Sequence, residues 1–218
     1  MDKTTGLQSI LIQYKWPLSL CLFIPCVYGA DDNESWTSIG FERRLPYSLK
    51  LEFEQELKLA DQASTFKQTF SEVSLSYKIF GGLRIQVPYR HSTFKGGTKQ
   101  RLSFGGSYKH SFKPIGLKYR TRFQRTFEKN ENPEDLIRNK CTIEYKLDKN
   151  LEPYISSELF HFYNEPVQLD EYRLSFGLTV DIMKKNSIKI FYIFKKEDLT
   201  KSDPYEVNVF GLAYSFKM

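Results

Sequence analysis

Residues 47–59 read YSLKLEFEQELKL, and this stretch decides the fold. Its odd positions carry apolar side chains such as Leu49 and Phe53, whereas its even positions carry charged or polar ones such as Glu52 and Glu54. A β-strand places successive side chains on opposite faces, while a helix of the same sequence would spread both sets around its surface. The stretch therefore predicts a β-strand with one apolar and one charged face.

The same alternation continues along the chain. It is clear in segments 72–79, 83–90, 101–109, 117–124, 138–147, 172–182 and 210–217. Segments 151–163 and 187–195 are also predicted strands, although their two faces are less cleanly separated. This pattern predicts an all-β protein.

Two kinds of connection separate the predicted strands. Short turn-forming sequences recur about 35 residues apart, near Pro46, Gly81-Gly82, Pro114, Asn150 and Asn186. Longer polar connections lie between them, at 61–65, 92–98, 128–135, 164–169 and 195–204. Short turns at one end and longer loops at the other are typical of outer-membrane barrels. We therefore expect residues 47–218 to form an antiparallel up-and-down transmembrane β-barrel with an even number of strands, about ten.

Residues 30–46 form a leader that does not fit this count. Ile39, Phe41 and Leu45 keep the alternation of the following strand, yet Pro46 indicates a turn after them. If this segment crosses the membrane as an extra strand, an even count requires twelve strands, and no twelfth is evident. Otherwise the segment extends the first strand or lies in the lumen.

The amino-terminal residues 1–29 have the features of a secretory signal peptide. Basic residues precede an apolar run from Trp16 to Val27, and Gly29 belongs to a small-residue cleavage site. The run is too short to span a bilayer, which argues against an amino-terminal anchor. After cleavage Cys141 is the only cysteine, so we expect no internal disulfide.

The composition also fits a membrane barrel, although the mean hydropathy of -0.47 resembles that of a soluble protein. Every second residue of a transmembrane barrel strand is polar, so averaged hydropathy hides the lipid-facing side chains. Apolar residues at 40% and charged residues at 27% exclude a disordered chain and a helical membrane bundle. Aromatic residues reach 16%, more than a soluble domain of this size needs.

We expect the charged face to line the lumen and the apolar face to contact lipid. Charges occur at mid-strand in one strand after another, while the apolar face is almost unbroken. Gly105, Gly177 and Gly211 share the charged face, as expected where side chains crowd inside a narrow cylinder. A soluble periplasmic lipid-binding barrel with its apolar face inward would alternate equally well, and remains an alternative.

The carboxyl end carries the pattern Gly-x-x-aromatic-x-aromatic, formed by Gly211, Tyr214 and Phe216. This pattern resembles the signal that the barrel assembly machinery of the outer membrane reads on a last strand. Val209, where a polar residue is usual, and the two residues after Phe216 depart from it. We interpret the three residues as an assembly signal.

The mature chain also resembles a family of uncharacterised bacterial outer-membrane barrels, the domain-of-unknown-function family 2490 (DUF2490). The resemblance lies in Trp36 and the hairpin after it, in segments 121–125, 151–160 and 172–178, and in the closing strand. It implies an outer-membrane barrel and brings no known activity.

Opposite charges are expected to face each other across the lumen. Glu52, Glu54 and Glu56 form an acidic wall on the first predicted strand. The basic side chains opposite, together with Arg173, complete a predicted charge network: Lys118, Arg120, Arg122, Arg138 and Lys140. Unpaired charges in a narrow cylinder are costly, so these groups should pair or stay hydrated. The network either fills and rigidifies the barrel or creates a transverse field that selects small polar solutes.

Other classes of function find less support. An enzyme acting on lipids, such as a deacylase or phospholipase, would need a nucleophile beside a base. His91 and His110 precede serines that fall on the opposite strand face, and His161 lacks a serine at strand spacing. One cysteine and scattered histidines give no metal-ligand pattern, and no cofactor is expected. The basic residues alternate with apolar ones rather than forming a patch for nucleic acid.

We therefore expect an exported, non-enzymatic barrel in the outer membrane of a Gram-negative bacterium. Its role is structural, or it is a narrow channel for small polar solutes. Its expected partners are outer-membrane lipids, lipopolysaccharide and the barrel assembly machinery. The chain is basic, with a pI of about 9.0, and would attract lipopolysaccharide at the rims of the barrel. The alternatives are a lipid-acting barrel enzyme and a soluble lipid-binding barrel, and the oligomeric state stays open.

Overall fold

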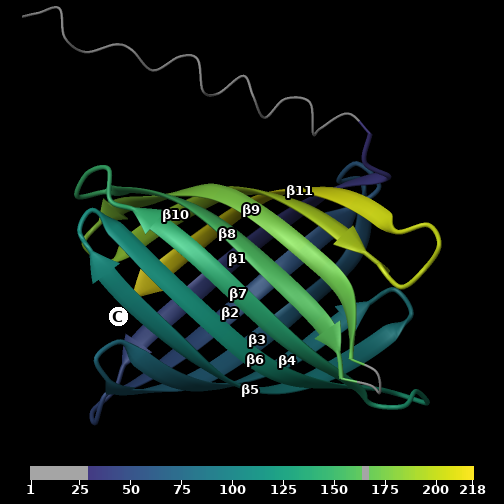
Figure 1. Ribbon diagram of the computed structural model, residues 1–218, viewed down its shortest axis with the longest axis horizontal. Helices are drawn as coiled ribbons and strands as arrows, with labels where there is room; N and C mark the ends of the chain where they lie inside the picture. The colour runs from purple at the N-terminus through teal and green to yellow at the C-terminus, as the bar shows by residue number, and fades with distance from the viewer. Residues whose placement is uncertain (1–28, 164–166) are drawn as a thin grey trace, which may run out of the picture. The chain divides into compact units, whose positions relative to one another are not determined.

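The computed structural model describes residues 29–163 and 167–218. Residues Asp31–Met218 form one compact unit. Within the described residues of this unit, eleven strands close into a barrel (Figure 1). They are β1 (Asp32–Arg44), β2 (Leu49–Ala60), β3 (Thr65–Phe80), β4 (Leu83–Phe94), β5 (Gly97–Phe112), β6 (Ile115–Glu128), β7 (Glu134–Tyr145), β8 (Leu151–Phe162), β9 (Gln168–Met183), β10 (Asn186–Glu197) and β11 (Tyr205–Lys217).

The predicted signal peptide lies, up to residue 28, outside the described residues. In the part of the chain that is described, no helix has both the length and the apolar character needed to cross a membrane.

The barrel closes through a parallel contact between its first and last strands. Consecutive strands pair antiparallel from β1 to β11, and β11 then pairs in parallel with β1. Asp32 lies opposite Val207 at one end of this seam, and Glu42 lies opposite Lys217 at the other. An odd number of up-and-down strands begins and ends in the same direction, so these two strands can meet only in parallel.

The predicted all-β up-and-down barrel is confirmed, and its strand number differs from the expected ten or twelve. Residues 32–44 form a separate wall strand, because β1 has hydrogen-bonded neighbours on both sides, β2 and β11. They neither extend the first predicted strand nor lie in the lumen. The expectation of an even number was wrong because it assumed an antiparallel closure.

The two ends of the barrel carry different connections. The turn end holds the carboxyl terminus and the connections β1–β2, β3–β4, β5–β6, β7–β8 and β9–β10. The loop end holds the start of β1 and the other connections, including residues 198–204, the yellow loop at the right of Figure 1. The long connection predicted at 92–98 is in fact a two-residue turn at Lys95 and Gly96, because β4 and β5 stay paired up to Phe94 and Gly97.

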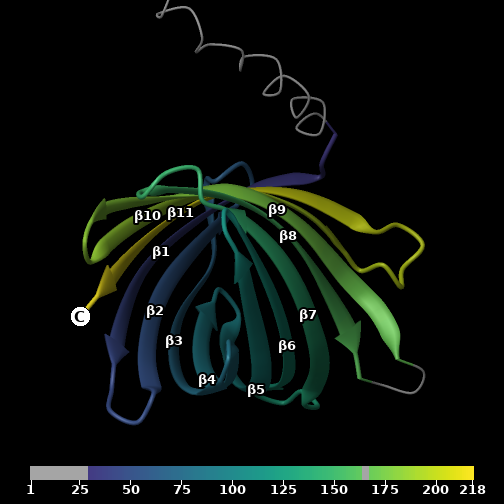
Figure 2. The same ribbon diagram turned by 60° about the vertical axis from the view of Figure 1, so that its left-hand side comes forward.

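The period of two places each strand's side chains as the sequence predicts. On β2, Phe53 and Leu57 are 38% and 41% exposed on the outer face, whereas Glu56 and Lys58 are buried on the inner face. Large apolar side chains are exposed in the same way on every strand from β1 to β11. Figure 2 shows the wall that carries these two faces. An exposed apolar band around a closed sheet is the surface that lipid covers in a membrane barrel.

A small apolar core lies inside the barrel, behind the parallel seam. Trp36 from β1, Ile193 from β10, and Val207 and Val209 from β11 are buried together, with Phe191 packed against them. Two of the three strands that supply this core are those that meet in parallel. The core therefore ties the seam together from the inner face.

The parallel seam predicts a specific cross-link. Thr37 lies directly opposite Leu212, and paired strands lie about 4.8 Å apart, within reach of a disulfide. On a Cys141→Ser background, Thr37→Cys with Leu212→Cys should oxidise to a cross-linked species with altered gel mobility. The matched control, Thr37→Cys with Tyr214→Cys, is offset by two residues, about 6.6 Å along the strand, and should cross-link poorly. Equal yields from both pairs, or none from either, would contradict the parallel register.

Candidate functional site in the barrel lumen

A cavity of about 930 Å³ extends along the lumen. Its lining includes Lys67 and Lys99 at the loop end, and Glu42 and Lys217 at the turn end. Charged and polar side chains line most of it. The lining of the cavity therefore reaches from one end of the barrel to the other and is mostly polar.

The predicted charge network lies in this interior. The structure places Glu52, Glu54, Glu56, Arg120, Arg122, Arg138, Lys140 and Arg173 on the lining of the large cavity. Lys118 lines two smaller cavities, of about 420 and 180 Å³.

The acidic wall does not pair with the basic wall opposite. Glu52 and Glu56 instead form ion pairs with lysines two residues away on β2, Lys50 at 2.6 Å and Lys58 at 3.4 Å. Glu54 forms no ion pair with any residue that the structure describes. Local pairing along one strand thus replaces the expected pairing across the barrel.

Glu158 on β8 is the acidic centre of the basic wall. Its carboxylate is 5% exposed and lies 2.9 Å from Arg138 and 3.0 Å from Arg120. Lys140 lies 3.7 Å away. One carboxylate thus compensates three cations from β6 and β7, which leaves a local excess of positive charge.

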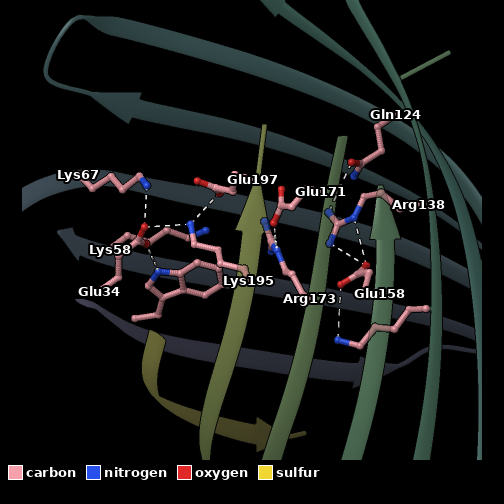
Figure 3. Close-up of polar contacts among 12 residues, drawn as sticks. Glu34, Lys58, Lys67, Gln124, Arg138, Glu158, Glu171, Arg173, Lys195 and Glu197 are labelled. Carbon is pink, nitrogen blue, oxygen red and sulfur yellow. Dashed lines mark hydrogen bonds and ion pairs between the residues drawn. The ribbon is translucent and has the colours of Figure 1, made fainter. Parts of the chain in front are cut away.

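A second acidic centre, Glu34, lies near the loop end of β1 (Figure 3). Its fully buried carboxylate accepts hydrogen bonds from the indole of Trp36 at 2.7 Å and from Lys67 at 2.7 Å. Lys195, whose side chain is 2% exposed, lies 2.9 Å from Glu34 and 2.7 Å from Glu197. These contacts connect β1, β3 and β10 across the parallel seam.

Cations and aromatic rings alternate around part of the lumen, in a set of side chains that we call the cation–aromatic belt. The belt consists of Arg90, Phe70, Lys58, Trp36, Arg173, Phe160 and Arg138. Lys58 lies 3.5 Å from the centroid of the Trp36 ring, and Arg173 lies 4.4 Å from that of Phe160. A cation over an aromatic face is stabilised by the ring quadrupole. The aromatic faces therefore stabilise part of the positive charge that the carboxylates of the lumen do not neutralise.

The predicted assembly signal divides between the two faces of β11. Tyr214 and Phe216 lie on the outer face, where Tyr214 donates a hydrogen bond to Asn186 and Phe216 packs against Phe41. Gly211 faces inward, and a Cβ added there would lie 2.0 Å from the Phe191 ring. Gly211 therefore has a packing role inside the barrel, whatever the assembly machinery reads.

The sequence reasoning missed several lumen residues, namely Glu34, Trp36, Glu72, Glu158 and Lys195. All five lie on the inner parity of their strands, which was the signal that identified the other charges. Trp36 and Glu158 also lie in stretches that carry the family resemblance, but no role was assigned to them. Alternation identifies the inner face of a strand. It does not show which of the inner charges bind several partners, because that depends on their depth in the lumen and on the register between strands.

Among the described residues, no group of three or more His, Cys, Asp or Glu is placed to hold a metal ion. His110 lies between Tyr108 and Phe112, both on the exposed outer face.

Comparisons with known proteins agree with this architecture. The family model described as "Protein of unknown function (DUF2490)" matches residues 33–206, which confirms the resemblance inferred from the sequence. No curated protein matches the chain. The NanC porin, solved in a rhombohedral crystal form, is similar with a TM-score of 0.57 at 12% identity, over 86% of this chain and 99% of that chain.

Two further solved structures are more distant. A bacterial polysaccharide outer membrane secretin has a TM-score of 0.49 at 9% identity, over 78% of this chain and 62% of that chain. An anion-selective porin from Comamonas acidovorans has a TM-score of 0.41 at 11% identity, over 79% of this chain and 54% of that chain. The barrel fold is the one shared with the NanC porin.

The role of Glu158 predicts a stability loss when its charge is removed. Glu158→Gln leaves Arg120, Arg138 and Lys140 without their shared carboxylate, and breaking a buried ion pair costs about 3 kcal/mol. Urea unfolding in detergent, followed by heat-modifiable gel migration, should show a loss of this size. The control Glu152→Gln lies on the inner face of the same strand, in no ion pair with a described residue, and should change the free energy of unfolding by less than about 0.5 kcal/mol. Equal losses in both variants would refute the central role of Glu158.

Proposed function

The chain belongs to the DUF2490 family of proteins of unknown function, and we propose that it is a narrow outer-membrane channel for small polar solutes. The observation that carries this proposal is the polar cavity lined from Lys67 and Lys99 at one end to Glu42 and Lys217 at the other. A polar path through a barrel with an apolar outer band is what passage of a hydrophilic solute across a membrane requires. The fold shared with a structure named as a porin supports the same role.

The network supports a narrow channel rather than a wide one. The ion pairs of Glu158 and Glu34 and the cation–aromatic belt occupy part of the cross-section. A small barrel leaves little free bore once its inner side chains are in place. The remaining passage therefore suits small solutes, which would move between charged groups rather than past an apolar wall.

The proposal also assigns an orientation. In outer-membrane barrels the short turns face the periplasm and the longer loops face outward. The carboxyl terminus and the turn end would then face the periplasm, and β1 would begin at the outer surface. The start of β1 and the carboxyl terminus lie at opposite ends of the barrel because β1 and β11 run in the same direction.

A non-enzymatic role is the better supported choice. His91 is exposed on the outer face of β4, while its neighbour Ser92 is buried on the inner face. Such a pair cannot act as a nucleophile with its base. A lipid-acting enzyme, a soluble lipid-binding barrel and a non-conducting structural barrel remain as outcomes of the test.

The channel proposal predicts that filling the lumen blocks it. Gly40 lines the large cavity, and a Cβ added there would make only ordinary contacts of 3.6–3.8 Å, so a side chain can begin there without a clash and extend into the cavity. In planar bilayers the wild type should give steady single-channel conductance, and Gly40→Trp should lower it severalfold because the indole occupies the passage.

The matched control is Ile39→Trp, which adds the same ring to the outer face of the same strand, where Ile39 is 41% exposed. It should conduct as the wild type does. A silent wild type would refute the channel, and phospholipid hydrolysis or lipid A deacylation by that silent barrel would favour the enzyme. Solubility without detergent would favour the lipid-binding barrel.

A further inference from the structure

We propose that the cavity between β2 and β6, in the turn half of the lumen, binds small oxyanions such as phosphate or carboxylate groups. This cavity has a volume of about 420 Å³ and adjoins the large cavity already described, with which it shares lining residues such as Glu72, Arg120 and Arg122. We call it the β2–β6 cavity. The inference rests on the proposed function, because a solute reaches an interior site only if it enters the lumen.

The first observation is an excess of positive charge on the lining. Of the described side chains that line the β2–β6 cavity, seven are basic and three are acidic. Glu52 pairs with Lys50 of the same lining at 2.6 Å, and Glu72 pairs with Arg90, which is not on this lining, at 2.7 Å. The large cavity, by contrast, is lined by nearly equal numbers of basic and acidic side chains from the described chain.

Several of these cations have no compensating carboxylate. Lys78, Arg84 and Lys118 lie within 4 Å of no acidic group among the residues that the structure describes. Arg122 has only Glu72, at 3.9 Å, and that carboxylate already binds Arg90. Uncompensated cations in a confined space are costly, and an anion bound between them would remove that cost.

The second observation concerns polar atoms that are buried without a hydrogen bond. Within the described residues four side-chain atoms are in this state, and three of them belong to the lining of the β2–β6 cavity: Ser74 Oγ, Gln86 Nε2 and Arg122 Nε. Each of these groups is a potential hydrogen-bond donor. A buried donor left without an acceptor costs about 1–3 kcal/mol, and three such donors belong to residues that line one cavity, where a ligand rich in acceptors would offer them partners.

The sheet register places two of these residues on either side of a glycine. Gln86 lies opposite Gly105 on β5, and Gly105 lies opposite Arg122 on β6. A Cβ at Gly105 would lie 2.4 Å from the backbone oxygen of Thr121, so the position holds no side chain. No side chain therefore stands between Gln86 and Arg122, and both residues line the β2–β6 cavity.

An oxyanion matches this lining better than other solutes. Phosphate and carboxylate oxygens accept several hydrogen bonds at once and carry the negative charge that the lysines and arginines require. Neutral sugars would satisfy the donors and leave the cations uncompensated. The geometry therefore points to an acidic solute whose phosphate or carboxylate group enters the β2–β6 cavity.

Equilibrium binding of inorganic phosphate to the detergent-solubilised barrel, measured by calorimetry against a chloride background, tests this site. The wild type should bind phosphate. Lys118→Gln should weaken binding about tenfold or more, because a hydrogen bond to a charged group is lost. Gln86→Leu, which changes no charge and keeps the side-chain volume, should weaken binding severalfold. The matched control Lys189→Gln removes an equivalent lumen charge that does not line the β2–β6 cavity, and should leave the affinity within about twofold.

Competition by acetate assigns the ligand class. If acetate displaces phosphate, the site recognises oxyanions in general, and if it does not, the site is specific for phosphoryl groups. Failure of the wild type to bind either anion above the chloride background would overturn the proposal. So would equal weakening by Lys118→Gln and Lys189→Gln, since a diffuse positive potential would explain both. A barrel that conducts ions but does not bind phosphate would support the channel and refute the anion site. A barrel that binds phosphate but does not conduct would support the anion site and refute the channel.

Discussion

A closed sheet converts the two faces of its strands into an exterior and an interior, and the other features depend on this separation. Leu, Ile, Phe and Tyr side chains form the exposed band, while the charged side chains of the same strands are enclosed. Enclosure brings cations and carboxylates within a few ångströms of one another in a space too narrow for full hydration. The lumen is therefore organised by the need to compensate charge.

Compensation is achieved locally and incompletely. Glu158 and Glu34 each bind more than one cation, and the cation–aromatic belt places further cations on the faces of Trp36, Phe70 and Phe160. In the turn half, Lys118 and Arg84 form no ion pair with a described carboxylate. The interior is thus balanced along the large cavity and cationic in the β2–β6 cavity, which would allow one barrel both to stay rigid and to hold an anion.

Alternation, taken together with the turn spacing and the charges at mid-strand, predicted the barrel fold, the face of each strand and the nine charges that line the lumen cavities. Alternation could not predict which charges pair. The face on which a side chain lies depends only on its position in its own strand, whereas ion pairing depends on the register between strands and on the depth of each side chain in the lumen. Glu52 therefore pairs with Lys50 beside it, and Glu158 was overlooked although its parity was visible. The number of strands among the described residues could not be predicted either. Pro46 indicates only a turn, and Ile39 and Phe41 belong to a wall strand because that strand pairs in parallel with β11, from the far end of the chain.

Site-directed spin labelling at adjacent positions tests the separation of faces most directly. On a Cys141→Ser background, labels at Phe53→Cys and Glu54→Cys in lipid vesicles would be compared for collision with oxygen, which concentrates in hydrocarbon, and with a water-soluble nickel complex. The label at position 53 should respond mainly to oxygen and the label at 54 mainly to nickel, because one faces lipid and the other the polar lumen. The reverse pattern, with position 54 in hydrocarbon and position 53 in water, would contradict the account.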